Sequence, residues 1–189
     1  MVSKITKARG HKMKFNACAL LLLGLLPLAG CASSGSVRHA SAITAPKPFD
    51  LDLILVQASS SMGDLAAEQQ MLTDAIVSDL RDTHMFKAVS ANREEIGSGS
   101  GIILRAEIQK IKKISKEKRL WEGAVAGRAC IWLQVTVSDL NSGNQIETFE
   151  AYGESSGGSA LAGTTDEAIE RVANLLIGEV LKINSQTAE

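Results

Sequence analysis

An alternating run at residues 129–139 places the strongest constraint on what this chain can fold into. Apolar residues recur there with a period of two, which is typical of a strand in a sheet with one covered face. The apolar positions are Ala129, Ile131, Leu133, Val135 and Val137. A turn at residues 141–144 follows, and residues 145–152 return as a second strand. The sequence therefore predicts an antiparallel hairpin whose apolar face needs a cover.

Two amphipathic segments supply that cover. Residues 65–83 carry an apolar stripe at helical spacing, with His84 at the C-terminal end. Residues 165–184 carry a longer stripe, and Thr164 before it and Glu167 in its first turn have the spacing of a capping box. With the remaining strands, this order predicts an α+β fold. It is a two-layer sandwich, with a mostly antiparallel sheet of four to five strands and two helices on one face.

Three further strands complete the predicted sheet. Residues 50–57 form a short apolar run that is typical of a buried strand, and residues 85–91 form a second strand. A third strand starts at Ile102 and continues into a basic stretch that ends at Arg119. We interpret the basic stretch as a solvated strand end, where lysines block edge pairing. A binding patch for anionic headgroups is the alternative.

The amino-terminal segment has the layout of a secretory signal. Five basic residues precede an apolar run at residues 15–28, which is shorter than the roughly 20 residues that span a bilayer. Leu28-Ala29-Gly30-Cys31 then resembles the bacterial lipobox at all four positions. Met13 alone begins a complete signal, so both Met1 and Met13 stay open as the start.

This signal predicts the domain organisation. Residues 1–30 are a lipoprotein signal peptide, residues 31–48 are a lipidated cysteine and a flexible tether, and residues 49–189 are a single α+β domain. Acyl chains on Cys31 would hold the protein at a membrane. More than one chain is needed there, because a single chain binds a membrane only marginally. Small, polar and proline residues dominate the tether, which therefore lacks the apolar surface to order itself.

Composition excludes several classes of function. After Gly30 the chain holds 15 basic and 21 acidic residues, a net charge of −6, which argues against nucleic acid as a partner. Cys130 is then the only cysteine besides Cys31, and we predict a buried structural thiol. His39 and His84 are the only histidines after Gly30, and neither has zinc-ligand spacing. No metal and no cofactor is expected.

Two motifs resemble catalytic ones but lack essential parts. Residues 153–157 match G-x-S-x-G, yet no histidine follows Ser155 to serve as the base. Residues 158–165 have phosphate-loop spacing, but Thr164 stands where the lysine is needed. The sequence therefore predicts no catalytic residue, and we expect that the protein is not an enzyme.

From Leu104 to the final helix, the chain resembles a family of bacterial lipoproteins described as domain of unknown function 4410. The residues that carry the resemblance are Phe86, Val89, Leu104–Ile108, Arg119, Gly123, Gly127, Val135–Asp139, Gly143, Gly153–Gly158, Ala168 and Ala173. More distantly, the layout is similar to curli-secretion lipoproteins and to the amino-terminal domain of the translocation protein TolB. The resemblance implies a periplasmic lipoprotein module without established activity or catalytic residues.

These observations predict a lipid-anchored periplasmic interaction module that serves envelope assembly or secretion through a protein partner. The alternative is an oligomeric pore or secretion-channel subunit, as in the curli-type lipoproteins; the sequence leaves the oligomeric state open. By resemblance to other lipoproteins, the residues after the lipidated cysteine decide between the two membranes. Ala32 and Ser33 are uncharged, so we expect an outer-membrane protein whose domain faces the periplasm.

Overall fold

In the computed structural model the chain divides into two compact units, Met1–Gly30 and Cys31–Glu189. The structure describes residues 34–41, 51–157 and 162–185, all of which belong to the second unit. The predicted signal peptide, Cys31 and residues 42–48 of the predicted tether lie outside the described residues.

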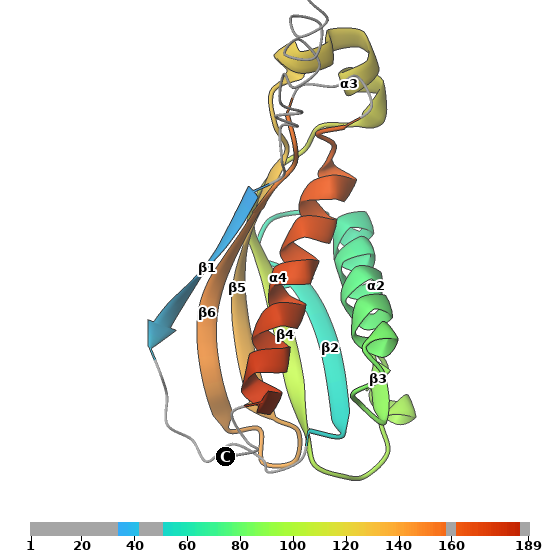
Figure 1. Ribbon diagram of the computed structural model, residues 1–189, viewed down its shortest axis with the longest axis vertical. Coiled ribbons are helices and arrows are strands. Elements are labelled where there is room, and N and C mark those ends of the chain that lie inside the picture. Colours follow the sequence, from blue (N-terminus) through green and yellow to red (C-terminus); the bar gives the residue numbers. More distant parts are fainter. Residues whose placement is uncertain (1–33, 42–50, 158–161, 186–189) are drawn as a thin grey trace, which may run out of the picture. The chain divides into compact units, whose positions relative to one another are not determined.

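One sheet of six strands carries the fold, in the order β1-β6-β5-β4-β2-β3 (Figure 1). The strands are β1 (Ser34–Ser41), β2 (Leu53–Ser60), β3 (Ala88–Ser90), β4 (Gly101–Lys112), β5 (Cys130–Asp139) and β6 (Gln145–Glu154). The helices are α2 (Ala66–Asp82), α3 (Lys116–Glu122) and α4 (Thr165–Ser185), with 3-10 turns η2 (Arg93–Glu95) and η3 (Gly123–Ala126). The predicted α+β class is confirmed.

The sheet is mixed, which corrects the prediction of a mostly antiparallel sheet of four to five strands with two helices. Strand β6 pairs antiparallel with β1 and β5, and β5 pairs antiparallel with β4. Strand β2, however, pairs parallel with both β3 and β4. Helix α2 follows β2 and returns the chain to the end of the sheet where β2 began, so that β3 runs in the same direction.

Helices α2 and α4 cover one face of the sheet, as the two apolar stripes predict (Figure 1). All five apolar residues of the alternating run are at most 1% exposed. They belong to one core with Leu72 and Ile76 of α2 and with Val172 and Leu176 of α4. The hairpin and its cover therefore form the layer pair that the periodicity predicts.

The first half of strand β2, residues 53–56, is buried on both faces, which explains why its sequence hardly alternates. Ile54 and Val56 face the main core. Leu53 and Leu55 pack instead in a second, smaller cluster with Ile96 and Leu140. Loop residues thus cover the face without helices at this end of the sheet.

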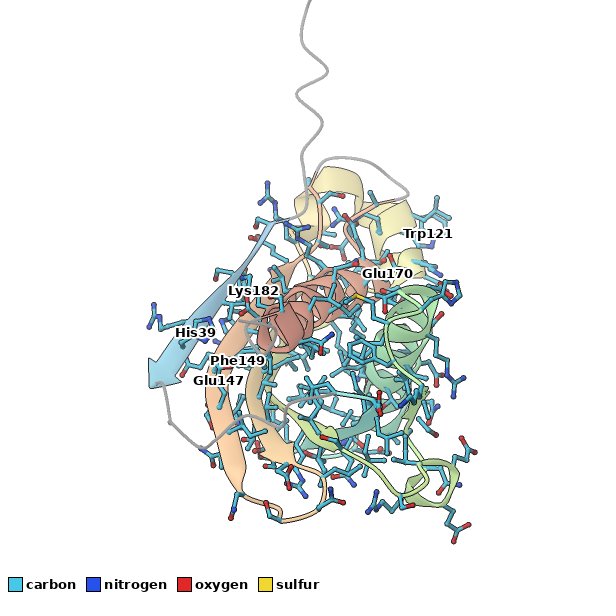
Figure 2. All side chains as sticks on the ribbon, turned by 60° about the horizontal axis from the view of Figure 1, so that its bottom comes forward. His39, Trp121, Glu147, Phe149, Glu170 and Lys182 are labelled. Carbon is cyan, nitrogen blue, oxygen red and sulfur yellow. The ribbon has the colours of Figure 1, made fainter. Side chains whose placement is uncertain are left out.

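Strand β1 corrects the predicted tether, because residues 34–41 pair with residues 148–154 of β6, with one register shift between His39 and Ser41. His39 lies over Phe149, with a ring-centroid distance of 5.6 Å (Figure 2). Its Nδ1 is 2.8 Å from a Glu147 oxygen, and its Nε2 is 3.4 Å from a Glu179 oxygen. Side chains of β6 and α4 therefore hold the strand, in addition to backbone hydrogen bonds.

The small residues that indicate a tether have a packing reason in β1. A Cβ on Gly35 would lie 2.6 Å from Leu175 Cδ1 and 2.8 Å from the Tyr152 oxygen. Only glycine fits so close to α4 and β6. The absence of a side chain at Gly35 therefore permits this close approach.

Candidate functional site

The connection between β4 and β5, residues 113–129, is called the tip below. It stands at the end of the sheet where β4 and β6 end and β1 and β5 begin (Figure 1). The prediction of a solvated strand end is wrong from Lys113 onward, because β4 ends at Lys112 and α3 begins at Lys116. Ser115 caps α3, since its Oγ accepts a hydrogen bond from Lys118 N at 3.1 Å.

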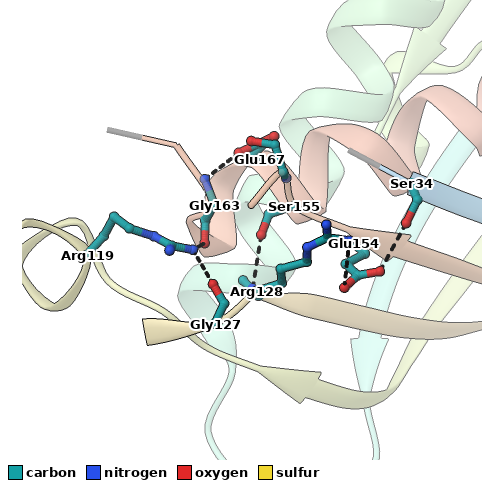
Figure 3. Close-up of polar contacts among 10 residues, drawn as sticks. Ser34, Arg119, Gly127, Arg128, Glu154, Ser155, Gly163 and Glu167 are labelled. Atoms are coloured by element: carbon teal, nitrogen blue, oxygen red, sulfur yellow. Dashed lines mark hydrogen bonds and ion pairs between the residues drawn. The ribbon is translucent and has the colours of Figure 1, made fainter. Parts of the chain in front are cut away.

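Arg119 lies inside the tip and is completely buried, although its sequence context indicates a solvated charge. Its Nη1 donates to the Gly123 oxygen at 2.9 Å. Its Nη2 donates to the Gly163 oxygen at 2.8 Å and to the Gly127 oxygen (Figure 3). A planar guanidinium suits this role because it offers five donors in a fixed geometry. Arg119 therefore fastens the tip to the segment before α4.

Glycine is required where Arg119 meets that segment. Gly163 has a φ of +85°, and a Cβ there would collide with the guanidinium. Gly123 ends α3 with a φ of +57°, and Gly127 has a φ of +81°. The recurrence of Arg119, Gly123 and Gly127 in the family resemblance was the sequence signal for this cluster, although it carried no indication of burial.

Ser155, the serine of the G-x-S-x-G pattern, is buried and makes hydrogen bonds that join two strands. The residue is 0% exposed, and its Oγ accepts a hydrogen bond from Ala129 N at 3.0 Å (Figure 3). Its own N–H donates to the Ala129 oxygen at 3.0 Å. Ser155 thus extends the pairing of β5 and β6 beneath the tip.

Glu167 connects the same region to α4. Its carboxylate accepts hydrogen bonds from Ser156 N at 2.7 Å and from Gly163 N at 2.6 Å (Figure 3). Burial raises its pKa, but these bonds and the nearby Arg119 outweigh burial and hold the pKa below the usual 4.5. Glu167 therefore reaches back toward the start of α4, as the predicted capping box requires. The N–H groups that it binds, however, belong to Gly163 and Ser156.

The outer surface of the tip is apolar. Trp121 is 87% exposed, Val125 is 91% exposed and Leu120 is 65% exposed, more than any other large hydrophobic residue that the structure describes. Sequence reasoning missed these residues. The available signal was an apolar pair, Leu120-Trp121, that belongs to no buried stripe and directly follows a cluster of lysines.

The tip is also basic within an acidic domain. Residues 113–129 hold five basic and two acidic residues, a net charge of +3, whereas the rest of the chain after Gly30 has a net charge of −9. Lys113 Nζ lies 2.6 Å from a Glu68 oxygen in α2, and Lys116 Nζ lies 2.8 Å from an Asp166 oxygen in α4. These two pairs tie the tip to the first turns of both helices.

A half-buried aromatic pair lies on the sheet face that α2 and α4 leave open. Trp132 and Tyr152 are neighbours on β5 and β6, with ring centroids 4.8 Å apart. Lys110 Nζ lies over the Trp132 ring at 4.9 Å from its centroid. A shallow hollow of about 310 Å³ adjoins both aromatic residues and is lined also by Arg38 and Glu150. Burial raises the pKa of Tyr152 to about 12.

The cysteine and histidine predictions have separate outcomes. Cys130 is buried, as predicted, and burial raises the pKa of its thiol. His84 follows the last turn of α2 with a φ of +53°, as a helix-end residue does. Cys31 lies three positions before Ser34, the first described residue. Within the described ranges no three His, Cys, Asp or Glu side chains form a metal-binding group, and no helix has the length and hydropathy to cross a membrane.

Comparison with known proteins finds one family model. The model described as Domain of unknown function (DUF4410) matches residues 35–159. The match therefore begins inside β1 and includes β6, Ser155 and the whole tip. No curated protein matches the chain.

Several solved structures are similar in fold. A crystal structure of a Xanthomonas campestris protein of family DUF330 is 18% identical, covers 81% of this chain and 95% of its own, and has a TM-score of 0.50. A PelC dodecamer from Paraburkholderia phytofirmans is 15% identical and covers 80% of this chain and 97% of its own, with a TM-score of 0.45. A methionine variant of that dodecamer is 14% identical, with coverages of 76% and 95% and a TM-score of 0.48.

Proposed function

Because this chain belongs to the family of domain of unknown function 4410, whose name assigns no activity, we propose its function from its own residues. The protein is a lipid-anchored, non-catalytic interaction module of the bacterial envelope, and it serves envelope assembly or secretion.

The observation that carries this proposal is the lipobox-like Leu28-Ala29-Gly30-Cys31 directly before a folded domain. Strand β1 begins at Ser34, so only two residues separate it from Cys31. Three residue steps span at most about 10 Å when fully extended. Lipid on Cys31 would therefore hold the sheet close to the membrane surface.

Two features support a binding role without chemistry. The hydroxyl with nucleophile spacing, Ser155, is buried and already accepts a backbone hydrogen bond. The half-buried Trp132 and Tyr152 pair, with Lys110 beside it, supplies aromatic surface of the kind that is enriched at protein interfaces. The open sheet face is therefore our candidate surface for the envelope partner.

We place the protein at the outer membrane with the domain facing the periplasm. This placement rests on resemblance to other lipoproteins and on the uncharged Ala32 and Ser33 after the cysteine.

Metabolic labelling with a radioactive fatty acid tests the anchor. The Cys31→Ser variant should lose the label, keep its signal peptide and no longer depend on acyl chains for membrane attachment. Cys130→Ser is the matched control, because it removes the other cysteine of the mature chain and should label normally. A Cys31→Ser protein that still carries fatty acid would contradict the proposal.

Site-specific photo-crosslinking in intact envelopes tests the partner surface. A crosslinker at Gln134, beside Trp132 on β5, should capture one specific envelope protein, whereas one at Asp74 on α2 should not. Absence of a specific product, together with a monomeric purified protein, would argue against an interaction module. Ion conductance in planar bilayers would instead support the alternative, a pore or secretion-channel subunit.

A further inference from the structure

The exposed apolar side chains of the tip come from two consecutive elements, α3 and η3. Leu120, Trp121 and Val125 lie within six residues, and Figure 2 shows Trp121 at the periphery of the domain. Three such side chains in water are unfavourable, since burying a large apolar side chain is worth about 1.5–3 kcal/mol. Scattered exposed residues are ordinary, but a local group on a fixed element indicates a surface that another phase or molecule covers.

The structure presents these side chains on a rigid support. Arg119, on the inner side of α3, binds three backbone oxygens and is fully buried. Lys113 and Lys116 join the tip to α2 and α4 through ion pairs. The apolar residues therefore cannot fold back onto the domain without breaking this network.

The charge around the apolar group fits an anionic surface. Residues 113–129 have a net charge of +3 in a domain that is otherwise strongly acidic. Lys118, two residues before Leu120, makes no ion pair within the residues that the structure describes. A tryptophan with neighbouring lysines is typical of segments that lie in the headgroup region of a bilayer.

The tip and Ser34, the first described residue of β1, lie at the same end of the sheet. Ser34 pairs with Glu154, Glu154 pairs with Cys130, and Cys130 pairs with Lys112, the last residue of β4. This row crosses four adjacent strands directly below the tip (Figure 1). Cys31 precedes Ser34 by three residues, so its acyl chains would enter the membrane on the side where the tip stands.

We propose that the tip inserts Leu120, Trp121 and Val125 into the headgroup region of the membrane that carries the lipid on Cys31. Lys118, the tip lysine outside the two ion pairs, binds anionic phospholipid headgroups. This inference rests on the proposed lipid anchor and adds a second attachment point. Two attachment points fix the orientation of the domain, so that the sheet stands upright on the membrane.

Tryptophan quenching in vesicles tests the insertion. The chain has two tryptophans, so the Trp132→Phe variant leaves only Trp121 as a fluorophore. The full lipidated protein is reconstituted in phosphatidylethanolamine–phosphatidylglycerol vesicles that contain phospholipid brominated near the headgroup. Trp121 emission should shift to the blue and be quenched, and iodide in solution should quench it less than in the unfolded protein. The matched Trp121→Phe variant, which keeps Trp132, should show neither effect.

Vesicle flotation separates the two proposals. Protein that floats with the vesicles while Trp121 stays unquenched by bromolipid would overturn the insertion and leave the anchor intact. Wild-type protein that does not float would reject the anchor and the insertion with it. Bromolipid quenching that disappears as the protein-to-lipid ratio rises would show that a second copy covers the tip, which also overturns the inference. A serine variant at Leu120 and Val125 that folds and floats should lose the Trp121 quenching.

Discussion

Arg119 shows how one residue organises the end of the molecule that carries the tip. Its charge is separated from water, yet the neighbouring groups are mainly backbone oxygens that accept its hydrogen bonds. Charge-assisted bonds of this kind are stronger than neutral ones. Their loss leaves buried acceptors unpaired, which costs more than the net worth of the bonds themselves.

Replacement of Arg119 should therefore destabilise the protein strongly. Arg119→Ala is expected to lower the free energy of unfolding by about 3 kcal/mol or more, since each unpaired buried acceptor costs about 1–3 kcal/mol. Urea denaturation measures this change. Arg128→Ala is the control: its side chain is 42% exposed and its pair with Glu154 spans 3.5 Å, so we expect about 1 kcal/mol at most. Equal losses in both variants would contradict the structural role of Arg119.

We expect Glu167 to contribute to stability in a way that depends on pH and is lost in acid. The pKa of Glu167 is lower in the folded protein than in the unfolded chain. Its contribution to the free energy of unfolding is therefore fully present above pH 4.5, and it is lost as the pH falls through the folded-state pKa. Urea midpoints measured from neutral to acidic pH should fall less steeply for Glu167→Gln than for the wild-type protein. Parallel slopes over that range would show that the N–H groups of Gly163 and Ser156 do not favour the charged form.

Gly153 of β6 and Gly178 of α4 differ in how much space their surroundings leave for a side chain. Helix α4 contacts β6 closely at Gly153, where a Cβ would lie 2.6 Å from the Ala168 oxygen and 2.9 Å from Val172 N. Gly178, on the same helix, has no heavy atom within 4 Å of the corresponding position. A substitution at Gly153 therefore tests the packing of α4 against β6, whereas the same substitution at Gly178 tests helix propensity.

The same substitution at these two positions should have opposite effects. Gly153→Ala should destabilise the protein by about 1–3 kcal/mol, because α4 has to move away from β6. Gly178→Ala should stabilise it by about 0.5–1 kcal/mol, because alanine favours the helix over glycine. Thermal unfolding followed by circular dichroism compares the two variants. A Gly153→Ala protein as stable as Gly178→Ala would show that the contact between α4 and β6 is loose.

For the molecule as a whole, the distribution of charge and attachment gives the two ends of the sheet different roles. The end with the tip is basic, and β1 begins there, three residues after the predicted lipidation site. The remainder of the domain is acidic. An acidic body is repelled from anionic headgroups, and a basic tip is attracted to them. Both effects favour an upright orientation.

The choice of membrane should depend on the residue after Cys31. By resemblance to other lipoproteins, Ala32→Asp should retain the protein at the inner membrane, whereas the wild-type protein should fractionate with the outer membrane. Density-gradient separation of the two membranes measures the distribution. The conservative Ala32→Ser variant controls for an effect of any change at this position. Unchanged sorting of Ala32→Asp would reject the proposed localisation.

The periodicity of the sequence alone was enough to predict strand β5 and helices α2 and α4, which contribute side chains to the core. The alternating run at 129–139 and the stripes of α2 and α4 are long enough for the pattern of burial to appear in the residue order. Family membership also followed from the sequence. The same residue order left the partner, any catalytic role and the localisation as proposals.

Tertiary structure decided the parts whose chemistry depends on distant neighbours. Residues 34–41 have the composition of a tether, yet they become β1 because the edge of β6 supplies hydrogen-bond partners and Phe149 lies beneath His39. Arg119 occurs in a charged run, yet it is buried because Gly127 and Gly163 bring carbonyl oxygens to it from outside α3. Contacts between residues far apart in the chain have no local period, so only the folded arrangement defines these two features.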